Sequence, residues 1–277
     1  MIKNRQITQV VSGQNTSDGG GVKLKRIIGQ GALPRLDPFL MLDEFGSDQP
    51  EDYLAGFPEH PHRGFQTVTY MLAGKMQHTD SRGNVGMIES GGLQWMNAGK
   101  GIIHAEMPQQ SEGLMRGFQL WINLPATHKM SDPSYQDIPQ ADIPVLEVNS
   151  GLHVKVLAGT YGDISGPVNT QAVKPLFVDI LFHSTQTTAV PLEQGSTAFV
   201  YCYQGSVHIG EHQLVQGQLG VLSDGEQVEL VGQPDARCIL VSGQPINEPI
   251  VQYGPFVMNT QQEIDQALQD YRSGKLA

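Results

Sequence analysis

The sequence predicts an all-β protein built from two tandem jelly-roll β-barrels and a short C-terminal helix. Short apolar stretches alternate with turn signals: "VTYML" is followed by "AGK", and "LQWMN" is followed by "AGKG". One strand and its turn take ~8–12 residues, a spacing typical of β-sandwiches and barrels. The 32 glycines and 17 prolines are spread along the chain, as expected for a fold with many turns.

A change in this rhythm near residue 135 predicts two domains. The segment "THKMSDPSYQDIPQADIP" contains three prolines, and we expect a linker there, at about residues 127–145. Beyond it, segments such as "LFVDILFH" and "ARCILVSGQP" repeat the short-strand pattern. The prediction is a first domain over residues 1–135 and a second domain of the same architecture over residues 136–277.

Helical periodicity is confined to the end of the chain. From Ile264 onward, apolar residues recur at i, i+3, i+4 and i+7, which places them on one face of a helix. Thr260 and Glu263 match a capping box, in which each residue satisfies a backbone N–H of the other. We therefore expect an amphipathic helix over about residues 261–272.

Composition and charge exclude several classes of protein. The chain carries 28 acidic against 17 basic residues, a net charge of −11, and has no basic cluster, so direct binding of nucleic acid is not expected. No apolar run approaches the ~20 residues of a membrane span, and the start "MIKNRQITQVV" does not resemble a signal peptide. Cys202 and Cys238 lie in apolar strand-like runs and are expected to be buried free thiols, which suits the cytoplasm.

Two short histidine motifs predict a metal site. In "EHPHRGFQTVTY", His60 and His62 are one residue apart, and residues i and i+2 of a strand share a face. In "GKGIIHAEM", His104 and Glu106 have the same spacing, and about three strands are expected between the two motifs. Three imidazoles and one carboxylate suit Fe(II), Mn(II), Ni(II), Cu(II) or Zn(II), although a single such pair is more often just two polar strand residues.

The motifs also resemble a known family. "FPEHPHRGFQTVTY", "NAGKGIIHAEM", "RGFQLWINLP", "DPFLMLDEFG" and "YGPFVMNTQQEIDQA" are similar to the pirins, a branch of the cupin superfamily. The resemblance implies two cupin barrels, with one divalent metal ion, most often iron, in the N-terminal barrel. The implied ligands are His60, His62, His104 and Glu106, and the implied C-terminal cupin lacks metal ligands.

Three further residues near these motifs are open to more than one interpretation. Gln66 occupies the place where many cupins carry a glutamate ligand, and it is interpreted as a residue that tunes hydrogen bonding near the metal. Arg63 should point away from the ligand face, toward a surface salt bridge or a cationic rim. His78 alternates with Met76 and Asp80, and we expect it on a solvated strand face.

Two functions of different classes follow from the resemblance. The first is a dioxygenase that opens the ring of flavonols such as quercetin with O2, in which Glu106 is both ligand and catalytic proton acceptor. The alternative is a non-catalytic, iron-dependent regulator that binds a transcription factor or a metabolic enzyme. A purely structural metal is a third interpretation. We expect a monomer with a flavonol-like substrate and no membrane association.

Overall fold

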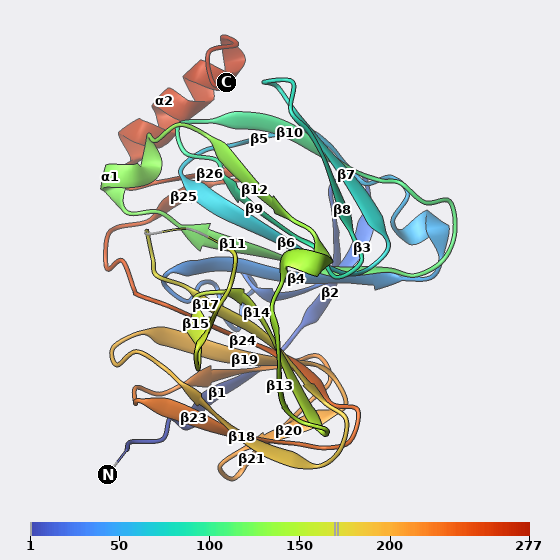
Figure 1. Ribbon diagram of the computed structural model, residues 1–277. Coiled ribbons are helices and arrows are strands. Elements are labelled where there is room, and N and C mark those ends of the chain that lie inside the picture. Colours follow the sequence, from blue (N-terminus) through green and yellow to red (C-terminus); the bar gives the residue numbers. More distant parts are fainter. Residues whose placement is uncertain (1, 169, 171) are drawn as a thin grey trace. The chain divides into compact units, whose positions relative to one another are not determined.

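The computed structural model describes residues 2–168, 170 and 172–277, which fold mainly into antiparallel strands (Figure 1). The predicted all-β class is therefore confirmed. The chain forms two compact units. Unit 1 comprises Met1–Gly13, Gly31–Leu33 and Ala141–Pro245, and unit 2 comprises Gln14–Gln30, Pro34–Gln140 and Ile246–Ala277. Each unit thus draws residues from both sides of the expected boundary at residue 135.

Unit 2 consists of two main sheets and one short hairpin. Its seven-stranded sheet has the order β12 (Ser134–Ile138), β9 (Leu93–Asn97), β6 (Phe65–Ala73), β11 (Met115–Asn123), β4 (Phe39–Ser47), β3 (Val22–Ile28) and β2 (Gln14–Asp18). Its four-stranded sheet has the order β5 (Phe57–His62), β10 (Ile102–Pro108), β7 (Lys75–Asp80) and β8 (Val85–Glu89). The hairpin pairs β25 (Val251–Tyr253) with β26 (Phe256–Met258).

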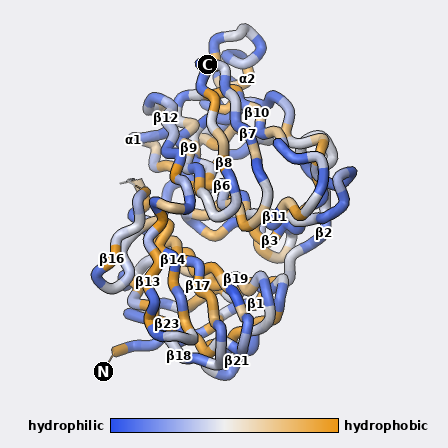
Figure 2. Tube along the Cα trace, turned by 45° about the vertical axis from the view of Figure 1, so that its right-hand side comes forward, coloured by the Kyte–Doolittle hydropathy of each residue, from blue (hydrophilic) through white to orange (hydrophobic). Residues whose placement is uncertain are grey.

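The apolar core of unit 2 fills one part of the space between its sheets. Buried side chains of the seven-stranded sheet, such as Leu24, Phe45 and Met71, cluster with Met76 and Ile88 of the four-stranded sheet. The rest of β7 is polar, and Figure 2 shows this strand as largely hydrophilic. The interior of unit 2 therefore combines an apolar region with polar side chains.

Unit 1 repeats the arrangement of one large and one small sheet. The seven-stranded sheet has the order β1 (Ile7–Ser12), β22 (Gln218–Leu222), β19 (Thr197–Gln204), β24 (Arg237–Gly243), β17 (Leu176–Phe182), β14 (Leu152–Ala158) and β13 (Val145–Asn149). The four-stranded sheet has the order β18 (Gln186–Pro191), β23 (Gln227–Gly232), β20 (Ser206–Ile209) and β21 (His212–Val215). A short pair, β15 (Thr160–Tyr161) and β16 (Ile164–Ser165), completes it.

The core of unit 1 is apolar from one sheet to the other. Leu152 and Val200 of the large sheet cluster with Val190 and Leu230 of the small sheet, and strands β14, β17 and β19 are strongly hydrophobic in Figure 2. The two cysteines are buried and free, as expected. Burial of this much apolar surface is the main stabilising contribution in such a barrel.

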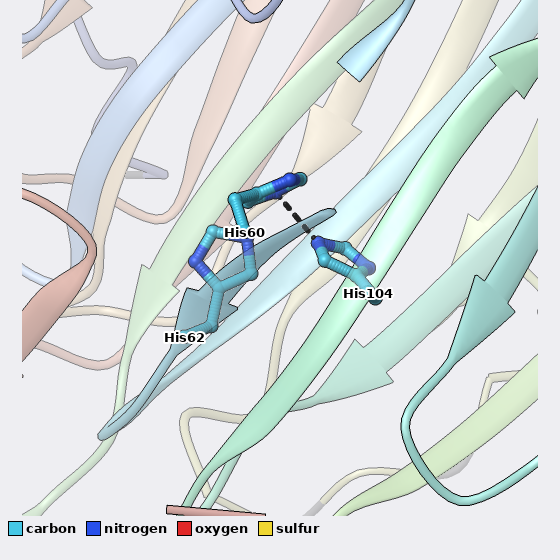
Figure 3. A group of neighbouring side chains, drawn as sticks. All are labelled: His60, His62 and His104. Carbon is cyan, nitrogen blue, oxygen red and sulfur yellow. Dashed lines mark hydrogen bonds between the residues drawn. The ribbon is translucent and has the colours of Figure 1, made fainter. Parts of the chain in front are cut away.

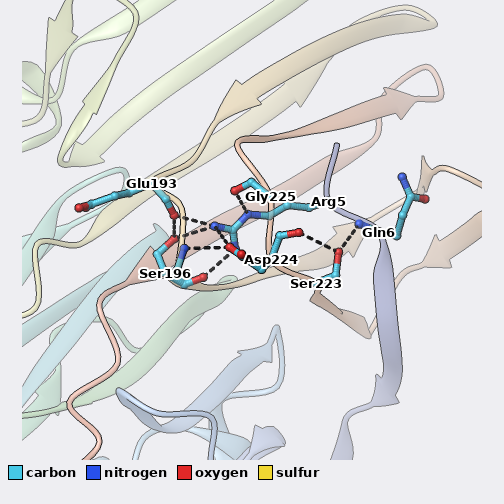
Figure 4. Close-up of polar contacts among 8 residues, drawn as sticks. Arg5, Gln6, Glu193, Ser196, Ser223, Asp224 and Gly225 are labelled. Atoms are coloured by element: carbon cyan, nitrogen blue, oxygen red, sulfur yellow. Dashed lines mark hydrogen bonds and ion pairs between the residues drawn. The ribbon is translucent and has the colours of Figure 1, made fainter. Parts of the chain in front are cut away.

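Arg5 fastens the N-terminal segment to unit 1 (Figure 4). The side chain is 1% exposed. Its Nε donates to the carbonyl of Gly225, Nη1 to the carbonyl of Ser196, and Nη2 to the carbonyl of Glu193 and to Ser196 Oγ. Because a buried guanidinium needs partners for its N–H groups, these acceptors fix where β1 enters the sheet.

The proline-rich segment, where the sequence predicts a linker, contains regular structure, and the chain passes from unit 2 to unit 1 within it, between Gln140 and Ala141. It contains the short helix α1 (Ala126–Lys129), β12 and a 3₁₀ turn (Gln140–Asp142), and β12 pairs with β9 along its length. Pro133 and Pro139 lie just outside β12, where a missing backbone N–H costs the sheet nothing. The prolines thus delimit a strand instead of preventing one. A further 3₁₀ turn (Pro50–Asp52) lies between β4 and β5.

The predicted terminal helix is confirmed as α2 (Gln261–Arg272), and Thr260 with Glu263 forms the expected capping box. Its buried residues Ile264 and Ala267 cluster with Phe256 of β26, so the helix is part of unit 2. Among the described residues, no helix has the length and apolar character needed to cross a membrane.

Candidate metal centre

Three histidines from two adjacent strands face one another in unit 2 (Figure 3). β5 and β10 are antiparallel, with His104 opposite His60 and Ile102 opposite His62. Because side chains alternate along a strand, His60 and His62 share the face of the sheet on which His104 lies. Four strands, β6 to β9, separate β5 from β10 along the chain, one more than the turn signals suggested.

The ring nitrogens of these histidines are close enough to share one cation. One nitrogen from each ring lies within 4.8 Å of the others, and His60 Nε2 is 2.8 Å from His104 Nε2. Two nitrogens at ~2.0–2.1 Å from one metal and at right angles to each other would be ~2.9 Å apart. The buried group could therefore bind a metal ion with little rearrangement.

His62 provides an independent test of that fit. Its ring is 1% exposed, and neither Nδ1 nor Nε2 has a hydrogen-bond partner among the described residues. A buried polar group without a partner costs ~1–3 kcal/mol. A cation at one of these nitrogens would compensate for this cost, so the residues present fit a metal.

Hydrogen bonds to Nδ1 orient the other two rings so that their Nε2 atoms face each other. His60 Nδ1 lies 2.8 Å from the carbonyl oxygen of Pro58, an acceptor, so Nδ1 carries the proton and Nε2 has the lone pair. His104 Nδ1 lies 3.4 Å from His78 Nε2. A second ring nitrogen engaged in this way is how metal-binding histidines are usually oriented.

Electrostatics keep two of the three imidazoles neutral. Burial, followed by the neighbouring histidines, holds the pKa of His62 and of His104 well below the usual range. Metal ions bind the neutral imidazole, because a protonated ring has no lone pair to donate. The group is therefore ready to bind a cation at neutral pH without first releasing protons from these two rings.

Glu106, the predicted fourth ligand, is not part of the histidine group within 4.8 Å. It is buried, and its carboxylate lies 3.1 Å from Thr69 Oγ1 through Oε1 and 3.4 Å from Gln119 Nε2 through Oε2. The Thr69 hydroxyl also lies 2.6 Å from Gln119 Oε1. One hydroxyl proton thus faces two acceptors, and coordination by Glu106 remains a prediction.

His78 lies in the interior of unit 2, not on the solvated face that its strand pattern predicts. It was expected on a solvated face, yet its side chain is 1% exposed. Because side chains alternate along β7, His78 lies on the same face as Met76, which belongs to the buried core of unit 2. Burial lowers the pKa of His78, and its ring centroid is 4.6 Å from that of His104.

A polar cavity of about 440 Å³ borders His78. Its lining includes His78, Arg82, Asn84, Gln94, Tyr135 and Asp137. Gln94 donates to Asp137 over 2.7 Å, and burial raises the pKa of Tyr135. These residues come from β7, β9, β12 and the turn after β7, so no local sequence pattern distinguishes them as a group.

Arg63 points away from the histidine face as expected, but it is not a surface residue. It is 4% exposed, its Nε donates to the carbonyl of Lys100, and its Nη1 binds Asp270 of α2 at 2.8 Å. Its backbone pairs with Phe256 in an isolated bridge. The C-terminal segment therefore covers the outer side of the strand that carries His60 and His62.

Gln66 also turns out to lie outside the histidine group. It is buried at 6% exposure, and its Oε1 accepts a hydrogen bond of 3.2 Å from Trp95 Nε1. Thr67 and Thr69 alternate with it along β6, and Thr69 faces Glu106. The position that holds glutamate in many cupins therefore faces away from Glu106 in this chain.

The two barrels and the buried histidines define a two-domain protein of the cupin type with a group that could hold a metal ion. The Pirin family matches residues 21–122, and the Pirin C-terminal cupin domain matches residues 177–277. The chain belongs to the pirin family.

Individual relatives cover the whole chain. A Pseudomonas aeruginosa protein named "putative quercetin 2,3-dioxygenase" is 46% identical over 284 aligned residues, with 100% of both chains covered. Mouse pirin is 40% identical over 282 residues, which cover 99% of this chain and 95% of mouse pirin. The crystal structure of quercetin 2,3-dioxygenase from Acinetobacter baumannii superposes with a TM-score of 0.93 at 33% identity, covering 99% of each chain.

Proposed function

We propose that this protein is a metal-dependent dioxygenase that opens the ring of flavonols such as quercetin with O2. The observation that carries the proposal is the convergence of three imidazole nitrogens from His60, His62 and His104 in a buried group. The names of its quercetin 2,3-dioxygenase relatives support the choice of substrate class. Fe(II) is the proposed ion, since imidazole and carboxylate donors suit it.

The histidines would hold the ion, and two features keep the rings in place. The Pro58 carbonyl fixes the ring of His60, and His78 contacts the ring of His104. When bound, the ion would act as a Lewis acid that makes a flavonol hydroxyl more acidic. The chain itself then has to accept the released proton.

Glu106 is the proposed proton acceptor, and its surroundings suit that role. If Oε1 receives a proton, it can donate to Thr69 Oγ1, while the Thr69 hydroxyl donates to Gln119 Oε1. Gln119 Nε2 holds the other carboxylate oxygen. In this arrangement each hydroxyl proton of the three side chains faces one acceptor, so the hydrogen-bond network has a place for the transferred proton.

The cavity beside His78 is large enough to admit part of a flavonol. Small-molecule pockets usually measure ~300–1,000 Å³, and this cavity has about 440 Å³. Its polar lining can hydrogen-bond to phenolic hydroxyls, with Asp137 accepting and Arg82 and Asn84 donating. Its lining, as described, includes His78, whose Nε2 lies 3.4 Å from His104 Nδ1, but none of the three histidines of the group itself.

The test is oxygen uptake with quercetin by iron-loaded protein. We expect uptake by the native chain, none by His104→Ala, and native uptake by His208→Ala, which changes a histidine of unit 1. Metal content is measured on each sample. A native protein that contains iron but consumes no O2 with quercetin would contradict the enzyme and favour the regulatory alternative.

A further inference from the structure

A second pair of histidines lies in unit 1, away from the group described above. His153 Nδ1 and His183 Nε2 are 3.2 Å apart, and their ring centroids are 4.6 Å apart at an interplanar angle of 71°. His183 is exposed and His153 is partly exposed. Two ring nitrogens that face each other at this distance can either share a proton or bind one cation together.

The sheet places both rings on its outer surface. Leu152 and Val154, which flank His153 on β14, belong to the apolar core, so His153 points outward. His153 is opposite Leu181 of β17, and His183 follows Leu181 by two residues and shares its side. The pair is therefore separate from the barrel interior, where apolar side chains fill the space.

The distance between the nitrogens matches a shared metal ligand pair. Two nitrogens at ~2.0–2.1 Å from a tetrahedral ion are ~3.3 Å apart. His153 and His183 would thus bind without a change in backbone position. Hard ions such as Mg²⁺ and Ca²⁺ prefer oxygen ligands, so the donor set favours Zn²⁺, Ni²⁺ or Cu²⁺.

Glu147 lies on the Nε2 side of the His153 ring, away from His183. It is the cross-strand partner of His153 on β13, and its Oε1 lies 3.9 Å from His153 Nε2. A carboxylate on that side favours the tautomer with the proton on Nε2, which leaves the Nδ1 lone pair facing His183. Metal-binding histidines are commonly oriented by a carboxylate in this manner.

We propose that His153 and His183 form a surface site for a divalent transition-metal ion, with Glu147 orienting His153. Water would complete the coordination shell, because the rings are exposed and only two protein nitrogens face the ion. Lys155, two residues along β14 on the same side, adds a positive charge nearby. This site should therefore bind more weakly than the buried histidine group of unit 2.

The experiment is a calorimetric titration of the metal-free full-length chain with zinc chloride. We expect two classes of site in the native protein. His183→Ala should lose the weaker class alone, and His104→Ala should lose the tighter class alone. His212→Ala is the matched control, since it removes an exposed histidine of unit 1 and should leave both classes intact.

Glu147→Gln tests the orienting role. It keeps the size of the side chain but removes its charge, and loss of such a partner typically costs 10–100-fold in metal affinity. We expect about a tenfold weakening of the second class only, because Glu147 is exposed. A single class in the native protein, or two unchanged classes in His183→Ala, would overturn the proposal.

Discussion

Replacement of Lys129 by methionine should lower the free energy of unfolding by about 2–4 kcal/mol. Lys129 is 1% exposed. Its Nζ donates to the carbonyl of Gly64 over 2.8 Å, to Asn123 Oδ1 over 2.6 Å and to the carbonyl of Val257 over 2.9 Å. The ammonium group thus connects helix α1 to the end of β11 through Asn123, to the loop at Gly64, and to strand β26 through Val257.

The magnitude follows from these contacts. Methionine fills a similar volume but donates no hydrogen bond, so three buried acceptors lose a partner at ~1–3 kcal/mol each. Part of this loss is offset, because methionine carries no charge that must be buried. Burial lowers the pKa of Lys129 to about 8, which means that burying its ammonium group costs about 3 kcal/mol at neutral pH. Carbonyl oxygens also tolerate the loss of one partner better than N–H groups do, which keeps the net value in the lower range.

The assay is urea unfolding at pH 7 of the native chain, of Lys129→Met and of a control variant, Lys100→Met. Lys100→Met is the matched control, since Lys100 is a half-exposed lysine paired with exposed Asp132, and exposed pairs contribute ~0–1 kcal/mol. A loss below about 1 kcal/mol in Lys129→Met, or equal losses in the two variants, would refute the assigned role of the ammonium group.

Three further predictions concern single side chains. Glu106→Gln should keep its metal through the histidines and lose quercetin turnover by ~10²–10⁴-fold; native turnover in a metal-loaded sample would exclude Glu106 as the proton acceptor. The hydrogen bond from Arg63 holds the pKa of Asp270 below its usual range, so this carboxylate stabilises α2 above pH ~4 and less as acid protonates it. Between pH 6 and pH 3, the free energy of unfolding in urea should therefore fall more for the native chain than for Asp270→Asn. Equal falls in the two proteins would count against a stabilising Arg63–Asp270 ion pair. Arg5→Met should cost about 3 kcal/mol or more in the same assay, since four buried acceptor contacts disappear, and a change under 1 kcal/mol would show that water replaces them.

Local sequence patterns predicted the features that depend on neighbouring residues alone, namely which side chains share a strand face and where the terminal helix begins. The spacing of His60 and His62 predicted that these two side chains share one face, because side-chain alternation holds in any strand. That His104 lies opposite His60 depends on the pairing of β5 with β10. The capping box at Thr260 likewise predicted the start of α2, because both of its partners lie within one turn.

Strand register and strand order could not be predicted from local sequence patterns. Thr69 and His78 meet Glu106 and His104 only through cross-strand pairing, which the sequence does not encode within a single segment. His78 was assigned to solvent because its own strand alternates like an exposed one; its burial depends on β10 and β8 on either side. The same holds for Arg63, whose partner Asp270 is 207 positions away.

That separation has a consequence for synthesis of the chain. At ~5–20 residues per second, a ribosome needs about 10–40 s to proceed from Arg63 to Asp270. The last strand of unit 1 leaves the ribosome before α2 does, since unit 1 ends at Pro245. Unit 2 is largely made first but completed last, so the histidine-bearing strands remain without their outer covering until the final residues of α2 emerge.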